Sequence, residues 1–410
     1  MNPGFPTLDD DALAATMAAL AAAGLAPDWP TPSDRAALAG STGWSGRHLD
    51  EAVRRAFAPY TLAACRRLVS LARRTASAAR ASPGNLDAPL PGNWGLLAIL
   101  AGRVPAVASG ALFQGLAARH TVVLKPSSAE PAFARLLCDL VARTAPFLAP
   151  AVTLLDAPPG DPRLVFAVAA APAVLAYGSD ATVAAIQADR PDGLTLVGGH
   201  RESIAILFGD ALGSTASAKR LARAIARDAS IYDQSGCLSP QVALVEDGAP
   251  VPARAFAHLL HEAFVETART LPPGPIPILD AAAVRMFLEE SRLLARASGG
   301  LVLPASGPVP PVVAFLPDLP ARRAPGCRVL QVVPFRGDPD LASLLPTLAS
   351  RLQGLAVAGD RRRLAAALDR FQAFRPCRVC APGRLQSPPA GWPENGVSVV
   401  RALAAARPSD

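Results

Sequence analysis

The sequence is poor in cysteine, aromatic residues and lysine, and each shortage excludes a class of protein. Its 410 residues contain six cysteines, too few for a disulfide-stapled scaffold. Aromatic residues make up 5% and basic residues are scattered, which disfavours a nucleic-acid reader. Of the 40 basic residues only Lys125 and Lys219 are lysine. Arginine has therefore replaced lysine wherever either serves, and a remaining lysine indicates a need for an ammonium group.

The sequence also lacks an uninterrupted apolar segment long enough to cross a membrane. Its longest charge-free stretch, 297–317, is interrupted by five prolines and three glycines. The first residues carry no basic region and lead into Asp9, Asp10 and Asp11, unlike a secretory signal. We therefore expect a soluble cytoplasmic protein with reduced thiols and no membrane-spanning segment.

Several common functional motifs are missing. No G-x-G-x-x-G follows a predicted strand, and the chain contains neither a Walker A sequence nor a G-x-S-x-G elbow. Cys377 and Cys380 form a lone C-x-x-C without a second pair, so a zinc site would lack ligands. His258 and His261 do not have the metalloprotease order, and we expect no bound metal.

Periodicity predicts an α/β protein that begins with helices. The first 85 or so residues are helical in pattern, with an arginine-rich stretch over 47–82 that we interpret as a solvated helix face. Short apolar runs then predict strands at 96–100, 121–124, 151–155, 165–168, 174–177, 203–207, 241–246, 312–315 and 329–333. Helices are predicted at 110–119, 132–143, 180–188, 217–228, 253–270, 281–296, 340–352 and 360–372. This alternation is typical of parallel sheets, here in two α/β lobes.

The most informative segment is Tyr232-Asp-Gln-Ser-Gly-Cys-Leu-Ser-Pro-Gln241. It places Cys237 in a turn of small residues between a predicted helix and a predicted strand. Such a turn can expose a thiol, and the backbone N–H groups around it can stabilise a thiolate or an oxyanion. Taken alone, the segment leaves a buried structural cysteine as the alternative.

Two further segments point to a nucleotide. Lys125 follows a buried strand in Val122-Val-Leu-Lys-Pro-Ser-Ser128, where a compact ammonium group can reach a ribose hydroxyl or a phosphate. Ala176-Tyr-Gly-Ser179 ends a strand and opens a helix, whose N–H groups and dipole can hold a pyrophosphate. Ordinary loop chemistry is the alternative for each.

Together and in this order, these segments resemble the LuxC-type acyl-CoA reductase branch of the aldehyde dehydrogenase superfamily. The resemblance covers about residues 90–400, and its most specific parts are the cysteine segment and the run 382–389. The matching segments are Ala101-Gly-Arg-Val-Pro105, Leu124-Lys-Pro-Ser-Ser128, Tyr177-Gly-Ser179, Gly198-Gly199, Asp233-Gln-Ser-Gly-Cys-Leu-Ser-Pro-Gln241, Val333-Pro-Phe335 and Pro382-Gly-Arg-Leu-Gln-Ser-Pro-Pro389.

The resemblance implies an aldehyde dehydrogenase-like α/β fold of two three-layer domains. We expect a helical segment, 1–89, packed on a nucleotide-cofactor domain, 90–205, followed by a catalytic domain with a C-terminal return segment, 206–410. The implied activity is NAD(P)H-dependent reduction of an acyl-CoA or acyl carrier protein thioester to an aldehyde. A homo-oligomer or a complex with an acyl-loading enzyme is also implied, and no nucleic-acid partner is expected.

The resemblance also assigns roles to residues. Cys237 corresponds to the nucleophile that accepts the acyl group. NADPH is the expected cofactor, with NADH as the alternative, and a CoA thioester is the expected substrate. The cofactor contacts carried over are Lys125, Ser127, Gly178, Ser179, Gly198 and Gly199.

Two positions depart from the family pattern. Arg103 stands where the pattern has an asparagine that donates to the oxyanion, a donor whose loss costs about 10²–10³ in rate. Leu196 and Val197 stand where hydrolytic aldehyde dehydrogenases have a general-base glutamate. The missing base favours a reductase, because hydride rather than water then attacks the acyl enzyme. Arg103 leaves open an impaired or acyl-transfer homologue, and an NAD-dependent, CoA-acylating aldehyde dehydrogenase is a further alternative.

Overall fold

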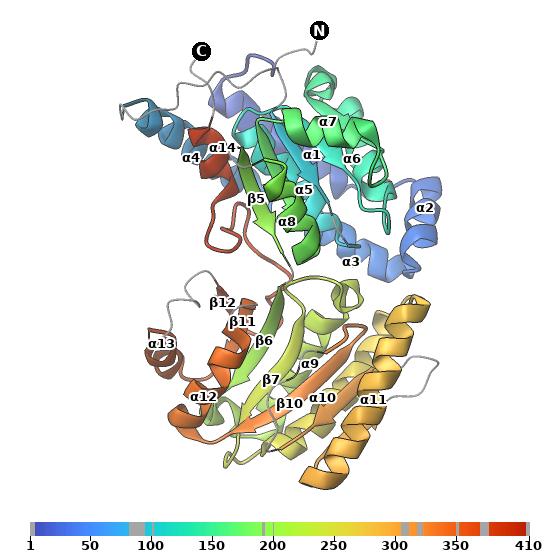
Figure 1. The fold of residues 1–410 in the computed structure, drawn as a ribbon, viewed down its shortest axis with the longest axis vertical. Helices are drawn as coiled ribbons and strands as arrows, with labels where there is room; N and C mark the ends of the chain where they lie inside the picture. Colours follow the sequence, from blue (N-terminus) through green and yellow to red (C-terminus); the bar gives the residue numbers. More distant parts are fainter. Residues whose placement is uncertain are drawn as a thin grey trace. The chain divides into compact units, whose positions relative to one another are not determined.

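A computed structural model describes most of the chain in atomic detail (Figure 1). The described residues are 5–81, 95–100, 102–190, 193–199, 201–304, 311–317, 322, 324–349, 352–369 and 377–406. They divide into a first unit, 1–200 with 388–410, and a second unit, 201–387.

The first unit is built on a parallel sheet of five strands in the order β3-β2-β1-β4-β5. Its strands are β1 (Leu96–Ile99), β2 (Val122–Lys125), β3 (Val152–Leu154), β4 (Ala173–Tyr177) and β5 (Leu194–Gly198). The helices between them are α5 (Pro105–Ala117), α6 (Ala132–Thr144), the short η1 (Pro146–Ala151), α7 (Pro162–Ala170) and α8 (Asp180–Ala188).

Alternate strand residues of this sheet face different helices. Leu97 and Val174 pack in one cluster with Ile186 of α8 and with α7. Leu96 and Val122 point to the other face, because successive side chains in a strand alternate, and they meet α5 there. Helices cover both faces, so the strands are apolar on both sides, as in other parallel sheets.

Four N-terminal helices and the last helix complete the first unit. They are α1 (Asp10–Gly24), α2 (Pro32–Thr42), α3 (Gly46–Phe57), α4 (Leu62–Ala81) and α14 (Val399–Ala405). Asp9 caps α1, and Thr31 with Asp34 forms a capping box on α2. Helix α1 packs on α4 and α6, α3 packs on α5, and α14 packs on α4. The N-terminal helical segment is thus joined to the sheet through α5 and α6.

The second unit contains a seven-stranded sheet in the order β12-β11-β6-β7-β10-β9-β8, parallel except for the antiparallel pair β8–β9. Its strands are β6 (Glu202–Leu207), β7 (Pro240–Glu246), β8 (Leu301–Pro304), β9 (Val312–Phe315), β10 (Val329–Phe335), β11 (Leu352–Ala358) and β12 (Arg378–Cys380). Its helices are η2 (Gly209–Leu212), α9 (Thr215–Ser230), η3 (Ile231–Gln234), α10 (Ala253–Thr270), α11 (Ile278–Ser298), α12 (Gly337–Ala349) and α13 (Arg361–Asp369).

The sheet of the second unit, like that of the first, is packed against helices. Phe208, Leu244 and Phe335 pack in one cluster with Leu345 of α12 and Leu364 of α13. Helices α9 and α10 pack together and contact β7, and α10 also contacts β9 and β10. A further cluster joins α11 to β9 near the edge of the sheet.

Most predicted elements are present, and one is wrong. Residues 165–168, expected to form a strand, belong to α7 instead, because the Asp161 carboxylate caps its start and Pro162 suits its first position. The strands β5, β8, β11 and β12 were not predicted. Parts of the predicted helices 340–352 and 360–372 lie outside the described residues.

The division into units differs from the expected domains in two places. Residues 201–205 belong to the second unit, because β6 pairs with β7 and β11. The expected catalytic domain, 206–410, loses residues 388–410 to the first unit, because α14 buries Val400 and Leu403 in the packing with α4 and α5. Within the described residues, no helix is long and apolar enough to span a bilayer.

Gly115 gives a test of how α5 packs on the first sheet. A Cβ at this position would lie 2.5 Å from Val122 Cγ2 and 3.3 Å from Leu96 Cδ2. We therefore expect Gly115→Ala to lower the free energy of unfolding by about 1–3 kcal/mol, measured by urea denaturation. Gly40→Ala in α2 is the control, since nothing lies within 4 Å of its Cβ position. A Gly115→Ala protein as stable as the wild type would contradict this packing.

Candidate active site

Cys237 lies in the turn between η3 and β7 of the second unit, and its side chain is exposed. Its neighbours Leu238 and Ser239 are buried. The Ser239 N–H donates to the Gly236 carbonyl at 2.9 Å, and the Ser203 hydroxyl of β6 donates to the Cys237 carbonyl at 2.9 Å. These two hydrogen bonds fix the backbone of the turn, while Cys237 itself remains exposed to solvent.

The backbone before this turn is left-handed at three successive residues that are not glycine. Tyr232, Asp233 and Gln234 have φ angles of 58°, 48° and 64°. Each such residue costs on the order of 1 kcal/mol or more, so it persists only where surrounding contacts impose it. The side chains of Asp233 and Gln234 supply such contacts.

Gln234 connects the left-handed segment to two strands. Its Nε2 donates to the carbonyls of Pro240 and Val329, both at 2.7 Å, and its Oε1 accepts from the Val329 N–H at 2.8 Å. The residue is 3% exposed. A single amide thus satisfies backbone groups at the starts of β7 and β10, and it holds the peptide that precedes the cysteine turn.

Asp233 forms a buried ion pair with Arg328. Arg328 donates through Nη2 at 2.6 Å and Nε at 2.9 Å to one carboxylate oxygen, while the Gly274 N–H donates to the other at 3.1 Å. Arg328 Nη1 also donates to the Leu271 carbonyl at 2.6 Å. Burial lowers the pKa of the Arg328 guanidinium and Asp233 opposes that shift. Removing Asp233 would leave the guanidinium of Arg328 buried without its charged partner, so the pair holds the backbone at Asp233 in place.

The run 382–389, which carries part of the family resemblance, also contacts the turn that holds Cys237. Gln386 donates through Nε2 to the Ser239 hydroxyl at 2.7 Å and to the Asp228 carbonyl at 3.2 Å. The Asp228 carboxylate accepts from the Gly383 N–H at 2.7 Å. The run therefore ties the end of α9 to the turn that carries Cys237, a role that the sequence alone did not predict.

The predicted cofactor residues lie in the first unit, at the carboxyl edge of its sheet. The chain passes from β1 to β2 and β3 on one side and then to β4 on the other, so the strand order reverses between β1 and β4. Ligands of open α/β sheets bind outside the carboxyl ends of the strands at such a reversal. Lys125 ends β2 and is 7% exposed, and burial lowers the pKa of its ammonium group while Asp156 opposes the shift.

The turn after β4 has the predicted helix start. The Ser179 hydroxyl accepts from the Thr182 N–H at 3.2 Å and caps α8, and a Cβ on Gly178 would lie 3.2 Å from Thr182 Cβ. Gly198 ends β5 and Gly199 follows it; the Gly178 N–H donates to the Gly198 carbonyl at 3.3 Å. An added Cβ at Gly198 would lie 2.8 Å from the Tyr177 ring, and one at Gly199 would lie 2.6 Å from the Asp180 carboxylate, so a larger residue at either position would displace one of these side chains.

Ser127 and Arg103 flank the ends of β2 and β1. The Ser127 hydroxyl accepts from the Ala129 N–H at 3.1 Å, so it stabilises the turn that precedes α6. With Gly102 and Glu130 it also lines a small hollow. Arg103 is half-buried in the turn before α5, next to Gly102 with φ 72°. Ala101, which begins the matching segment, lies outside the described residues.

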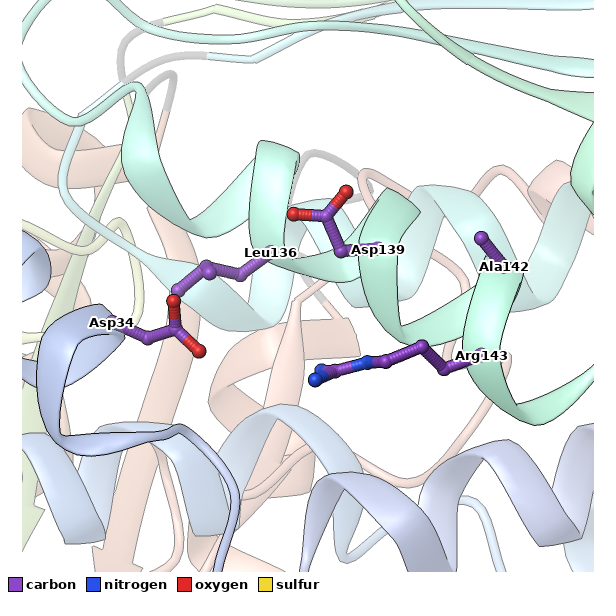
Figure 2. A pocket seen from close by; sticks show the side chains of 5 residues that line it. All are labelled: Asp34, Leu136, Asp139, Ala142 and Arg143. Carbon is purple, nitrogen blue, oxygen red and sulfur yellow. The ribbon is translucent and has the colours of Figure 1, made fainter.

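A larger hollow lies apart from these residues, between α2 and α6 (Figure 2). Its cavity volume is about 320 Å³, and Arg143 extends into it below Asp139, opposite Asp34. Two carboxylates and one guanidinium face this hollow, and none of the predicted site residues lines it. The hollow is not part of the candidate site.

The cysteines provide a test of which thiol is reactive. Burial raises the pKa of Cys65 and Cys377 to about 11 and that of Cys138 to about 12, and it also raises that of Cys380. A thiol with a pKa near 11 is only about one-thousandth thiolate at pH 8.

We therefore expect iodoacetamide at pH 8 to alkylate the exposed Cys237 first, measured by peptide mass spectrometry. The thiols of Cys65, Cys138, Cys377 and Cys380, of which the first is buried and the other three are partly buried, should react only as the pH approaches their raised pKa values. Equal labelling of Cys237 and Cys380 at pH 8 would contradict this assignment.

Comparison with solved structures identifies the fold. An oxidoreductase from Marinobacter aquaeolei has a TM-score of 0.71 at 13% identity, over 98% of this chain and 86% of that one. Aldehyde dehydrogenase 21 from Physcomitrella patens, solved with succinate, has a TM-score of 0.67 at 14% identity, over 98% and 85%. A 1-pyrroline-5-carboxylate dehydrogenase from Thermus with bound NAD has a TM-score of 0.66 at 13% identity, over 97% and 80%. These similarities confirm the predicted aldehyde dehydrogenase-like α/β fold.

Sequence comparison identifies the family. No curated protein matched the chain. The family model described as acyl-CoA reductase (LuxC) matches residues 95–406, which include β1, Cys237 and the run 382–389. The match covers most of the chain, and the protein is an enzyme that acts on acyl or aldehyde groups. The chain belongs to the acyl-CoA reductase (LuxC) family, on the aldehyde dehydrogenase fold.

Proposed function

We propose that this enzyme reduces an acyl thioester to an aldehyde with a reduced nicotinamide cofactor, through an acyl group carried on Cys237. The observation that carries the proposal is the exposed thiol on a rigidly held turn, in a chain of the acyl-CoA reductase family. An exposed thiol can meet a large substrate. The bonds of Gln234, Ser203 and Gln386 keep its backbone in one place.

The first step is attack of the Cys237 thiolate on the thioester carbonyl. A new carbon–sulfur bond forms to Cys237 and the bond to the coenzyme A sulfur breaks, so CoA leaves as a thiol after taking up a proton. Backbone N–H groups around the turn could donate to the oxyanion. A bound reduced nicotinamide would supply the hydride that reduces the acyl group. Collapse of the thiohemiacetal then releases the aldehyde and returns the Cys237 thiolate.

The residues before Gly198 support reduction over hydrolysis. β5 carries Leu196 and Val197 at the positions where a general base would stand, and neither can take a proton from water. Without such a base an acyl enzyme is slow to hydrolyse, so hydride transfer faces less competition.

The first unit suits a nicotinamide dinucleotide. Lys125 ends β2, one strand away from the reversal between β1 and β4, and its ammonium group would donate to a ribose hydroxyl or a phosphate there. The Gly178–Ser179 turn follows β4, which borders the reversal, and opens α8 at the same carboxyl edge of the sheet. Gly198 and Gly199 allow β5 to approach this turn closely. Asp180 in the first turn of α8 opposes an anion, so we assign the principal phosphate contact to Lys125. We propose NADPH as the cofactor, with NADH as the alternative.

The reaction gives a direct test. We expect the wild type to oxidise NADPH in the presence of at least one member of a panel of acyl-CoAs, with formation of aldehyde and CoA in equal amounts. Cys237→Ala should lose this turnover, because no acyl enzyme can form, whereas Cys380→Ala should retain it. Turnover by the wild type and by the two variants is followed by the absorbance of the reduced cofactor, with NADH assayed in parallel.

No turnover by the wild type, or equal turnover by Cys237→Ala, would overturn the proposal. Turnover only in the direction from aldehyde, CoA and oxidised cofactor would instead favour a CoA-acylating dehydrogenase.

Arg103 provides a second test. It stands where the family pattern has an asparagine, and this departure raises a second candidate function, acyl transfer without reduction. If its guanidinium supplies the oxyanion donor, Arg103→Ala should lower kcat by about 10²–10³, a loss measured with the best acyl-CoA. Arg163→Ala removes an exposed arginine from the same unit and should change little.

An Arg103→Ala enzyme as fast as the wild type would contradict the donor role. Accumulation of acyl-Cys237 without cofactor oxidation in the wild type would favour the alternative, an acyl-transfer homologue that does not reduce.

A further inference from the structure

Helix α11 has apolar residues on two opposite sides. Val284, Phe287 and Leu288 on one side are buried against β9 and its neighbours. On the other side Leu279, Met286 and Leu293 recur every seven residues, which is close to two helical turns, so they form one stripe. We call this row, with Ile278 at the helix start, the α11 stripe. Figure 1 shows α11 as a long helix at one edge of the second unit.

The α11 stripe is unusually exposed. Ile278, Leu279, Met286 and Leu293 are 85%, 79%, 73% and 68% exposed. These values are the four highest for large hydrophobic side chains among the described residues. An apolar row of this kind, running about 22 Å along the helix at 1.5 Å per residue, marks an interaction surface.

A row of arginines follows one side of the stripe. Arg285, Arg292 and Arg296 lie at helical spacing beside it, and Arg292 is paired with Glu289 at 2.7 Å. Within the described parts of the chain, Arg285 and Arg296 form no ion pair. Glu290 on the other side of the stripe is held by Arg322. The surface offers an apolar row with a positive edge, which an acidic amphipathic helix would complement.

The stripe begins at a segment that is tied to the nucleophile's turn. Leu271 and Gly274, which precede α11, bind Arg328 and Asp233 at 2.6 and 3.1 Å. Asp233 is four residues before Cys237. A partner seated on α11 therefore lies on a helix that is fixed, through this buried ion pair, to the turn that carries the thiol.

We propose that the α11 stripe docks an acidic acyl carrier protein that presents its acyl group as a thioester on a flexible arm. The proposal rests on the proposed function and names the carrier of its substrate. Apolar anchors along the stripe would give affinity, and the arginines would attract and orient a negatively charged helix.

A second copy of this chain suits the stripe less well. Antiparallel pairing of two α11 helices about a two-fold axis would bring the two arginine rows together, and like charges repel. Parallel pairing would place the arginine row of each copy opposite the other side of its partner's stripe. On that side Glu290 is already paired with Arg322 and is not available to the arginines. An acidic partner has neither problem.

The test compares two substrates that carry the same octanoyl group, octanoyl-CoA and an acidic octanoyl-acyl carrier protein. We expect Arg285→Glu/Arg296→Glu, and separately Met286→Glu, to lower kcat/KM for the carrier-bound substrate at least about tenfold, through KM. The value for octanoyl-CoA should stay within about twofold, because free CoA does not need the docking surface. Arg361→Glu/Arg362→Glu on α13 makes the same charge change at exposed positions and is the control.

Binding is measured separately, without cofactor, by fluorescence anisotropy of the labelled holo-carrier protein, and it should weaken as salt is added. A wild type that binds the carrier but reduces neither these two substrates nor any other acyl-CoA of the panel would support docking while overturning the proposed function. A wild type that reduces octanoyl-CoA but does not bind the carrier would overturn docking alone. Equal losses of kcat/KM for both substrates in the α11 variants would also overturn the docking proposal. A sedimentation experiment in which the wild type is a dimer and Met286→Glu is a monomer would overturn it too, because the stripe would then bind a second copy of the chain.

Discussion

The buried pair of Asp233 and Arg328 is the contact on which the candidate site depends. Three consecutive left-handed residues precede the cysteine turn, and none of them is a glycine. Such a backbone is unfavourable by itself, so it exists only because the ion pair and the three hydrogen bonds of Gln234 leave it no alternative. The same contacts join β7, β10 and the segment before α11, so the position of the thiol and the packing of the second unit are parts of one network.

The arginines of this protein have several different uses. Many form exposed ion pairs, such as those of Arg35 with Asp50 and Arg135 with Asp156, which contribute little to stability. Arg328 is the opposite case, 1% exposed and essential to the turn, and the row on α11 is a third. The net charge of +7 therefore says less about function than the positions of individual charges do.

Much of the fold could be predicted because its signals are local. The boundaries of α8, α10 and β9 follow directly from periodicity, capping residues and short apolar runs. The edge strands β8 and β12 were missed because they are short and only partly buried. Residues 165–168 were misassigned because a β-branched apolar run looks the same in a buried strand and in a short helix. Only the capped start at Asp161 distinguishes the two.

The sequence by itself determined the family resemblance, the order of the segments and the residues that could act, Cys237 and Lys125 above all. These depend on residue identity and spacing, which the chain carries in full. Only the tertiary structure decided what supports them. Gln386 contacts Ser239 across 147 positions of the chain, and Arg328 meets Asp233 across 95. Contacts between residues so far apart leave no periodic trace in a sequence, because they arise only when the sheet brings the strands together.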